Sequence, residues 1–163
     1  MIYSVKQKKY VPIDIKKEVY KTFTRYIVNE KSNAIESIGY IDLKDLKNGA
    51  EVIYMENKQP KLYKRFGMVA DQIELEHCLN NGISKPYIQS KSASGILLPH
   101  FKRGKRFINE GINIYLDYIL KNVKKGERVY TSDFGSQKMY MPMNLINKLM
   151  EKIKINPLLK GLK

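Results

Sequence analysis

The alternation of apolar and polar positions predicts a strand meander in the first third of the chain. Residues Val19–Val28 are rich in β-branched and aromatic side chains, Ala34–Leu43 alternate at a period of two, and Ala50–Met55 form a third apolar run. An Asn-Gly pair at residues 48 and 49 marks the turn before the last run. Three strands joined by short turns form an antiparallel meander.

The pattern changes to helical spacing after residue 65. Val69, Ile73 and Leu79 recur on one face of a helix over Phe66–Asn80, and the following Asn-Gly pair stops it. Beyond it the pattern predicts strands at Pro86–Ser90 and Lys105–Ile108, a weak helix at Ser92–Lys102, a helix in preference to a strand at Ile112–Val123, a hairpin or strand pair at Arg128–Met141, and an amphipathic helix at Asn144–Ile155. This order predicts the α/β (α+β) class, with a mixed, mostly antiparallel central sheet flanked by helices.

Composition narrows the class of protein. The 163 residues are 43% hydrophobic and 28% charged, which predicts one globular domain. Lys and Arg exceed Asp and Glu by 30 to 16, a net charge of +14 that attracts nucleic acid, anionic lipid or a polyphosphate cofactor. The single cysteine, Cys78, excludes an internal disulfide and a multi-cysteine zinc site, and we expect no metal. With no long apolar run and no signal peptide, we expect no membrane span and a cytoplasmic location.

The segment from Lys58 to Leu79 carries the most chemistry. Lys58, Lys61, Lys64 and Arg65 precede the predicted helix with no acid among them, and Gly67 lies where the helix begins. The first amides of a helix lack internal partners and favour an anion, and glycine allows a phosphate to approach closely. Two interpretations stay open on these residues: a phosphate site, or a solvated basic loop before a core helix.

Residues Lys64–Val69 resemble the pyrophosphate-binding pattern Arg/Gln-x-x-Gly-x-Gly/Ala of the GNAT acyl-CoA-dependent N-acetyltransferases, which also follows a strand meander and opens a long helix. Lys64 stands where Arg or Gln is usual, and Val69 where a small residue is usual. Residues Ala93–Gly104 resemble a second family pattern, in which Gly104 matches the glycine and His100 takes the tyrosine position. The resemblance implies a GNAT-like core over about residues 19–108 and a C-terminal α/β extension over 109–163.

The resemblance also implies a function and its residues. It implies direct transfer of an acetyl group from acetyl-CoA, as co-substrate, to an amine on a small molecule, protein or RNA. The implied contacts with acetyl-CoA are Met55, Lys64, Arg65, Phe66, Gly67, Met68 and Val69. The base that deprotonates the amine would be Glu51 or Glu56, with Glu56 nearer the strand end.

A proton donor is also needed for the leaving thiolate. The resemblance assigns this role to His100, with Tyr54 and Tyr63 as further donors. Structural interpretations stay open beside these roles, since Glu56 could be a solvated strand-end carboxylate and His100 a histidine packed on the sheet. His77 and Cys78 are adjacent on a helix and point apart, so we expect Cys78 to be a small core residue.

A second basic segment offers an alternative function. Lys102–Arg128 holds eight Lys or Arg and three acids, and Tyr115, Tyr118 and Tyr130 lie in or beside it. A solvated face and a surface for a polyanion, either RNA or the 3′-phosphate of CoA, both fit this pattern. The alternative to an enzyme is therefore a basic nucleic-acid-binding or regulatory protein on a GNAT-like scaffold, and we expect nucleic-acid contact to be weak.

Overall fold

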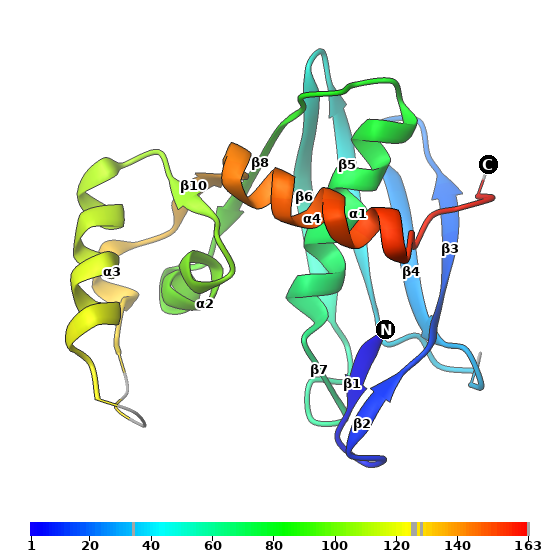
Figure 1. The fold of residues 1–163 in the computed structure, drawn as a ribbon, viewed down its shortest axis with the longest axis horizontal. Helices are drawn as coiled ribbons and strands as arrows, with labels where there is room; N and C mark the ends of the chain where they lie inside the picture. Colours follow the sequence, from blue (N-terminus) through cyan, green and yellow to red (C-terminus); the bar gives the residue numbers. More distant parts are fainter. Residues whose placement is uncertain (34, 125–126, 128, 163) are drawn as a thin grey trace. The chain divides into compact units, whose positions relative to one another are not determined.

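The computed structural model describes residues 1–33, 35–124, 127 and 129–162. Its contacts form two compact units, one made of Met1–Ile88 with Leu149–Lys163 and the other of Gln89–Lys148. Figure 1 gives the course of the chain. A single folding domain, with a core at 19–108 and an extension at 109–163, stays a prediction.

The main sheet of the first unit is an antiparallel meander. β3 (Ile13–Val19), β4 (Thr24–Glu30), β5 (Gly39–Leu46) and β6 (Gly49–Asn57) are neighbours in that order. The predicted strand Val19–Val28 is wrong in one respect, because the chain turns within it. The amide of Tyr20 donates to the carbonyl oxygen of Phe23 at 2.9 Å, which closes the turn between β3 and β4. Ala34, predicted to open the next strand, lies outside the described residues.

A smaller sheet completes the first unit. Its strands are β1 (Ile2–Ser4), β2 (Lys9–Val11) and β7 (Tyr63–Lys64), in the order β2-β1-β7. The helix α1 (Phe66–Asn80) follows β7 with the bounds that the sequence predicts. Its residues Phe66, Val69 and Ile73 share one apolar cluster with Val28 and Ile41 of the main sheet, so α1 covers one face of the meander (Figure 1).

Strand alternation decides which side chains face α1. Tyr26 and Ile41 are paired neighbours on the covered face, and Met55 pairs with Ile41 on the same face. Tyr40 and Glu56 are paired neighbours that point to the opposite face, because side chains alternate along a strand. The cofactor and catalytic residues predicted on β6 are therefore divided between two faces of the sheet.

The second unit is built around β10 (Gln137–Tyr140), which pairs with β8 (Tyr87–Ser92) and β9 (Arg106–Phe107). Its remaining elements are η1 (Ser94–Ile96), α2 (Leu97–Lys102), α3 (Glu110–Asn122) and η2 (Ser132–Phe134). The predicted hairpin over Arg128–Met141 is wrong, since the described part of it holds one strand; Arg128 itself lies outside the described residues. The helix α4 (Met143–Ile155) runs from this unit into the first.

Candidate functional site

The turn that opens α1 is cationic. Lys64 ends β7, and Arg65 adopts the left-handed conformation with φ at 71°, so the chain enters the helix at Phe66. Both basic side chains are exposed, and no described carboxylate forms an ion pair with either of them. The carbonyl oxygen of Arg65 accepts from the amides of Met68 and Val69. The preceding two amides, those of Phe66 and Gly67, have no acceptor within the helix.

The sequence predicts Gly67 as the key residue of this turn, but the unusual backbone conformation is at Arg65. Gly67 has no positive φ and lies within the helix, whereas Arg65 carries the left-handed backbone. Gly39 of β5 lies against the ring of Phe66, where α1 begins. A Cβ on Gly39 would clash with the carbonyl oxygen of Glu56 and lie 2.9 Å from the ring of Phe66. The ring of Phe66 can therefore pack directly on the sheet and fix where α1 begins.

The candidate catalytic residues of β6 lie beside a bulge. Tyr54 pairs with Asp42 and Val52 with Leu43, so Ile53 is an extra residue in β6. Bulges re-aim neighbouring side chains. Tyr54 is 52% exposed, and its ring stacks on that of Tyr40 at 5.5 Å. Glu56 is also exposed on this face, while Met55 packs toward the core beneath α1.

The face that carries Tyr54 and Glu56 is rich in aromatic rings. Arg25 forms a two-point ion pair with Asp42, with nitrogen–oxygen distances of 2.7 and 2.9 Å. The guanidinium carbon of Arg25 lies 4.2 Å from the ring centroid of Tyr40, and the ammonium of Lys58 lies 5.4 Å from the same centroid. The Asp42 bond raises the pKa of Arg25 above its ordinary value. This face therefore already holds cations against aromatic rings.

The other two acid and base candidates of this unit, Tyr63 and Glu51, are less exposed to solvent. Tyr63 is buried and donates its hydroxyl to Glu30 at 2.9 Å. Burial, followed by this hydrogen bond, raises the pKa of Tyr63. Glu51 is half-buried near the start of β6, on the far side of the bulge from Tyr54. Of the tyrosines proposed as donors, Tyr54 is the accessible one.

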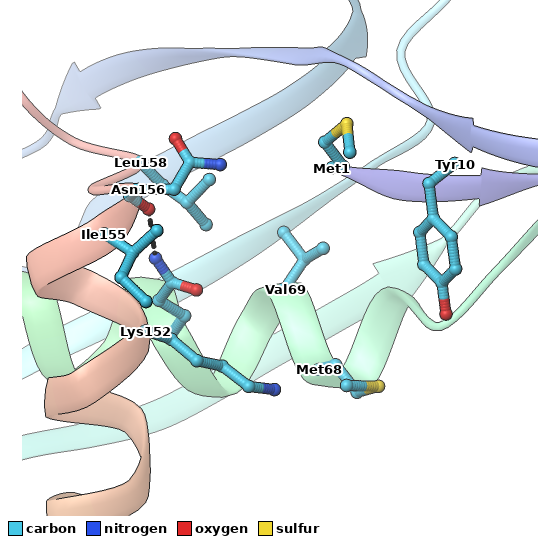
Figure 2. A pocket seen from close by; sticks show the side chains of 9 residues that line it. Met1, Tyr10, Met68, Val69, Lys152, Ile155, Asn156 and Leu158 are labelled. Carbon is cyan, nitrogen blue, oxygen red and sulfur yellow. Dashed lines mark hydrogen bonds between the residues drawn. The ribbon is translucent and has the colours of Figure 1, made fainter.

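A pocket of about 330 Å³ lies beside the first turns of α1 (Figure 2). Met68 and Val69, two of the predicted cofactor contacts, form one of its walls, and Met1 and Tyr10 form another. Lys152 brings a cation from α4. The remaining lining residues are Gln72, Ile155, Asn156 and Leu158. The cationic turn is therefore next to a largely apolar hollow.

His100 belongs to the second unit. It lies in α2, is 5% exposed, and its Nδ1 atom is 2.7 Å from Nη2 of Arg103. Since the guanidinium can only donate, Nδ1 accepts and the proton of the neutral ring is on Nε2. Burial, then the charges of Arg103 and Lys105, lower the pKa of His100 to about 3. The ring is therefore neutral at physiological pH.

Sequence reasoning missed a chain of hydrogen bonds at the last turn of α1. The hydroxyl of Tyr26 lies 2.7 Å from Nδ1 of His77, and Nε2 of His77 lies 2.6 Å from a carboxylate oxygen of Asp45. Burial, followed by the Asp45 charge, raises the pKa of Tyr26. No spacing in the sequence signals this arrangement, because its members come from three different elements. The neighbouring Cys78 is fully buried, and burial raises its pKa to about 12, which agrees with a core role.

Sequence reasoning also missed a clamp between α1 and the residues after α4. The buried carboxylate of Glu76 accepts from the amides of Leu158 and Leu159 at 2.9 Å and from the side chain of Gln72 at 3.0 Å. The same Gln72 nitrogen donates to the carbonyl oxygen of Asn156 at 2.9 Å (Figure 2). A glutamate in a helix ordinarily indicates a solvated face, so the sequence pattern does not predict that Glu76 is buried.

Comparison with solved structures identifies the fold. An acetyltransferase from Bacillus subtilis, in complex with CoA, superposes with a TM-score of 0.54 at 12% identity, over 81% of this chain and 99% of that chain. A protein from Bacteroides thetaiotaomicron that is described as an acetyltransferase of the GNAT family gives a TM-score of 0.33 at 17% identity, over 90% of this chain and 77% of that chain, which is too low to show a shared fold. No family sequence profile matches the chain, and no curated protein matches it. The chain therefore shares the fold of a solved acetyltransferase, and the predicted class, a mostly antiparallel sheet flanked by helices, is confirmed.

Among the described residues, none of the helices is both long and apolar enough to cross a bilayer.

Proposed function

We propose that this protein is an acyl-CoA-dependent N-acetyltransferase that moves the acetyl group of acetyl-CoA directly to an amine. One observation carries the proposal: a cationic turn that has no carboxylate partner among the described residues opens α1, on a fold shared with an acetyltransferase that holds CoA. A pyrophosphate is the group that such a turn suits, because the helix amides and the basic side chains all favour negative charge.

The residues of the turn fit the proposed co-substrate. Lys64 and Arg65 would hold the two phosphates by charge, and the amides of Phe66 and Gly67 would donate to their oxygens. Met68 and Val69 present apolar surface on the next turn of α1, next to the pocket of Figure 2. Met55 lies on the α1 side of the sheet and would contact the apolar arm of CoA.

Glu56 is the proposed base. It is exposed on the face of β6 opposite α1, where an amine could reach it from solvent. Its carboxylate would accept a proton from the ammonium form of the acceptor, so that the free amine attacks the thioester carbon. The new carbon–nitrogen bond replaces the carbon–sulfur bond, and the sulfur leaves as a thiolate that needs a proton.

Tyr54 and His100 are the proposed donors of that proton. Tyr54 has the better support, since its exposed side chain is on the same face as Glu56 and its hydroxyl can donate a proton to the thiolate. His100 is proposed from the sequence resemblance alone; it is buried within the second unit, and the N–H at Nε2 of its neutral ring releases a proton far less readily than a phenol does. Replacing each residue separately would distinguish the two roles.

The test of the proposal is calorimetric titration with acetyl-CoA. Gly67→Glu places bulk and a negative charge at the turn, and we expect it to weaken binding at least about 100-fold, equivalent to about 2.7 kcal/mol. The matched control is Asn147→Glu, which adds the same charge at an exposed position of α4. If folded Gly67→Glu protein binds acetyl-CoA as tightly as Asn147→Glu, the proposal is wrong.

A further inference from the structure

A second cationic site lies in the other unit, and the proposed acetyl transfer does not use it. It is a pocket of about 310 Å³ whose described lining holds four cations and no carboxylate. Lys102 and Arg103 come from the end of α2, Arg106 from β9, and Lys148 from α4. Among the described residues, none gives Lys102, Arg106 or Lys148 an ion pair. Like charges repel, so an anion in the pocket would lower the repulsion among Lys102, Arg106 and Lys148.

Arg106 is fixed in place before any ligand arrives. One nitrogen of its guanidinium, Nη1, donates to the carbonyl oxygens of Phe101 at 3.2 Å and Lys105 at 2.7 Å. The plane of the group stacks on the ring of Phe101, 4.1 Å from its centroid. The Nε and Nη2 donors make no hydrogen bond to the described residues. An arginine held in this way keeps a fork of donors for an oxyanion and loses little entropy on binding.

The backbone shapes the pocket around Arg106. Gly104 has φ at 110°, a region that favours glycine, and a Cβ there would lie 3.2 Å from the side chain of Leu145. The end of α2 can therefore approach α4 closely, which brings Arg103, Arg106 and Lys148 to one hollow. Asn144 and Leu145 of the first turn of α4 also line it. The side chain of Asn144 adds an exposed amide that can donate to an anion.

We propose that this pocket binds a phosphate group, either free phosphate or pyrophosphate or the phosphate ester of a small metabolite. A doubly charged oxyanion matches several converging cations better than a single carboxylate does. The pocket volume is that of a small-molecule site rather than of a groove for a duplex. The buried His100 behind Arg103 is consistent with this electropositive region, since its pKa is lowered by burial and then by Arg103 and Lys105.

The test is calorimetric titration with inorganic pyrophosphate at about 50 mM salt, where screening is modest. Lys102→Gln/Lys148→Gln removes two charges from the pocket, and we expect it to weaken binding at least tenfold. The matched control is Lys91→Gln/Lys138→Gln, which removes two exposed charges from paired positions of β8 and β10 in the same unit. We expect this control to stay within twofold of the parent protein.

The outcomes separate the proposal from its alternatives. Equal weakening by both double variants, or no heat of binding at 5 mM pyrophosphate, would overturn it, because binding would then reflect only the overall charge of +14. The same titrations in a Gly67→Glu background keep the acetyl-CoA turn out of the result, so this proposal and the proposed function can fail independently. If AMP binds more tightly than orthophosphate, the occupant is a phosphate ester, and if it does not, the occupant is the free anion.

Discussion

Replacing Glu76 by glutamine tests whether the clamp between α1 and residues 156–159 is a main source of stability. The carboxylate accepts from three donor groups, the amides of Leu158 and Leu159 and the side chain of Gln72. The amide of glutamine keeps one acceptor oxygen and turns an NH₂ group toward the remaining donors. One buried donor is then unsatisfied, at about 1–3 kcal/mol, and the others lose their charged partner at about 0.5–1.5 kcal/mol each.

The expected loss is therefore about 3 kcal/mol of the free energy of unfolding, a large part of the roughly 5–15 kcal/mol that holds a typical domain. In urea denaturation, with a slope of about 2 kcal/mol per molar, the midpoint should fall by about 1.5 M while the slope stays the same. The control is Glu151→Gln on α4, whose side chain is 73% exposed and, among the described residues, forms an ion pair with Lys154 alone, at 3.4 Å. Exposed pairs of this kind contribute about 0–1 kcal/mol. A Glu76→Gln midpoint equal to that of Glu151→Gln would refute this account of the clamp.

Two further predictions concern His100 and Gly39. The folded pKa of His100 is about 3, below its ordinary value of 6.5, so the unfolded chain binds the extra proton between these pH values. The stability that the neutral ring contributes is therefore complete above about pH 6.5 and is lost as the pH falls toward 3, by about 2 kcal/mol at pH 5. In urea titrations, His100→Gln should lose less free energy of unfolding between pH 7.5 and pH 5 than the parent protein does. An equal loss in the two proteins would contradict the burial of a neutral ring. Gly39→Ala should destabilise the fold by about 1–3 kcal/mol, because its methyl group meets the backbone of Glu56 and the ring of Phe66. The control is Gly95→Ala, where no described atom beyond the chain neighbours lies within 4 Å of the new Cβ. If the two variants melt at the same temperature, the sheet accommodates the new methyl group at Gly39 without cost.

The sequence predicts α1 well because the helix has strong local signals. Phe66–Asn80 combine helical spacing with an Asn-Gly stop, and the structure has the same bounds. The sequence pattern does not predict β3, because the consecutive residues Lys16 and Lys17 interrupt the alternation of apolar and polar side chains in this edge strand. The turn inside Val19–Val28 was hidden for the opposite reason, since Tyr20 and Phe23 favour strands by type but stack on each other across the turn, 4.8 Å apart.

The candidate site likewise combines features that the sequence predicts with features that it does not. The basic turn before α1 is a local feature, and the sequence places Lys64 and Arg65 correctly at its entry. What the sequence hides depends on partners that are far away along the chain. Glu76 meets amides 82 and 83 residues later, and His77 meets Tyr26 51 residues earlier. Helical periodicity treats such residues as solvated, because it carries no information about a second layer that covers the helix.

The discontinuous first unit has a consequence for the order of folding during synthesis. Met1–Ile88 emerges first, but the unit is completed only by Leu149–Lys163, after the whole of Gln89–Lys148 has been made. At about 5–20 residues per second, the 70 residues from Ile88 to Leu158 take roughly 3–14 s to translate. During that interval the carboxylate of Glu76 has none of its backbone partners, and the α1 surface that Leu158 and Leu159 cover is open. The nascent chain should therefore depend on chaperones most strongly while its second unit is being made, and that unit, a continuous stretch, can fold before the first unit is complete.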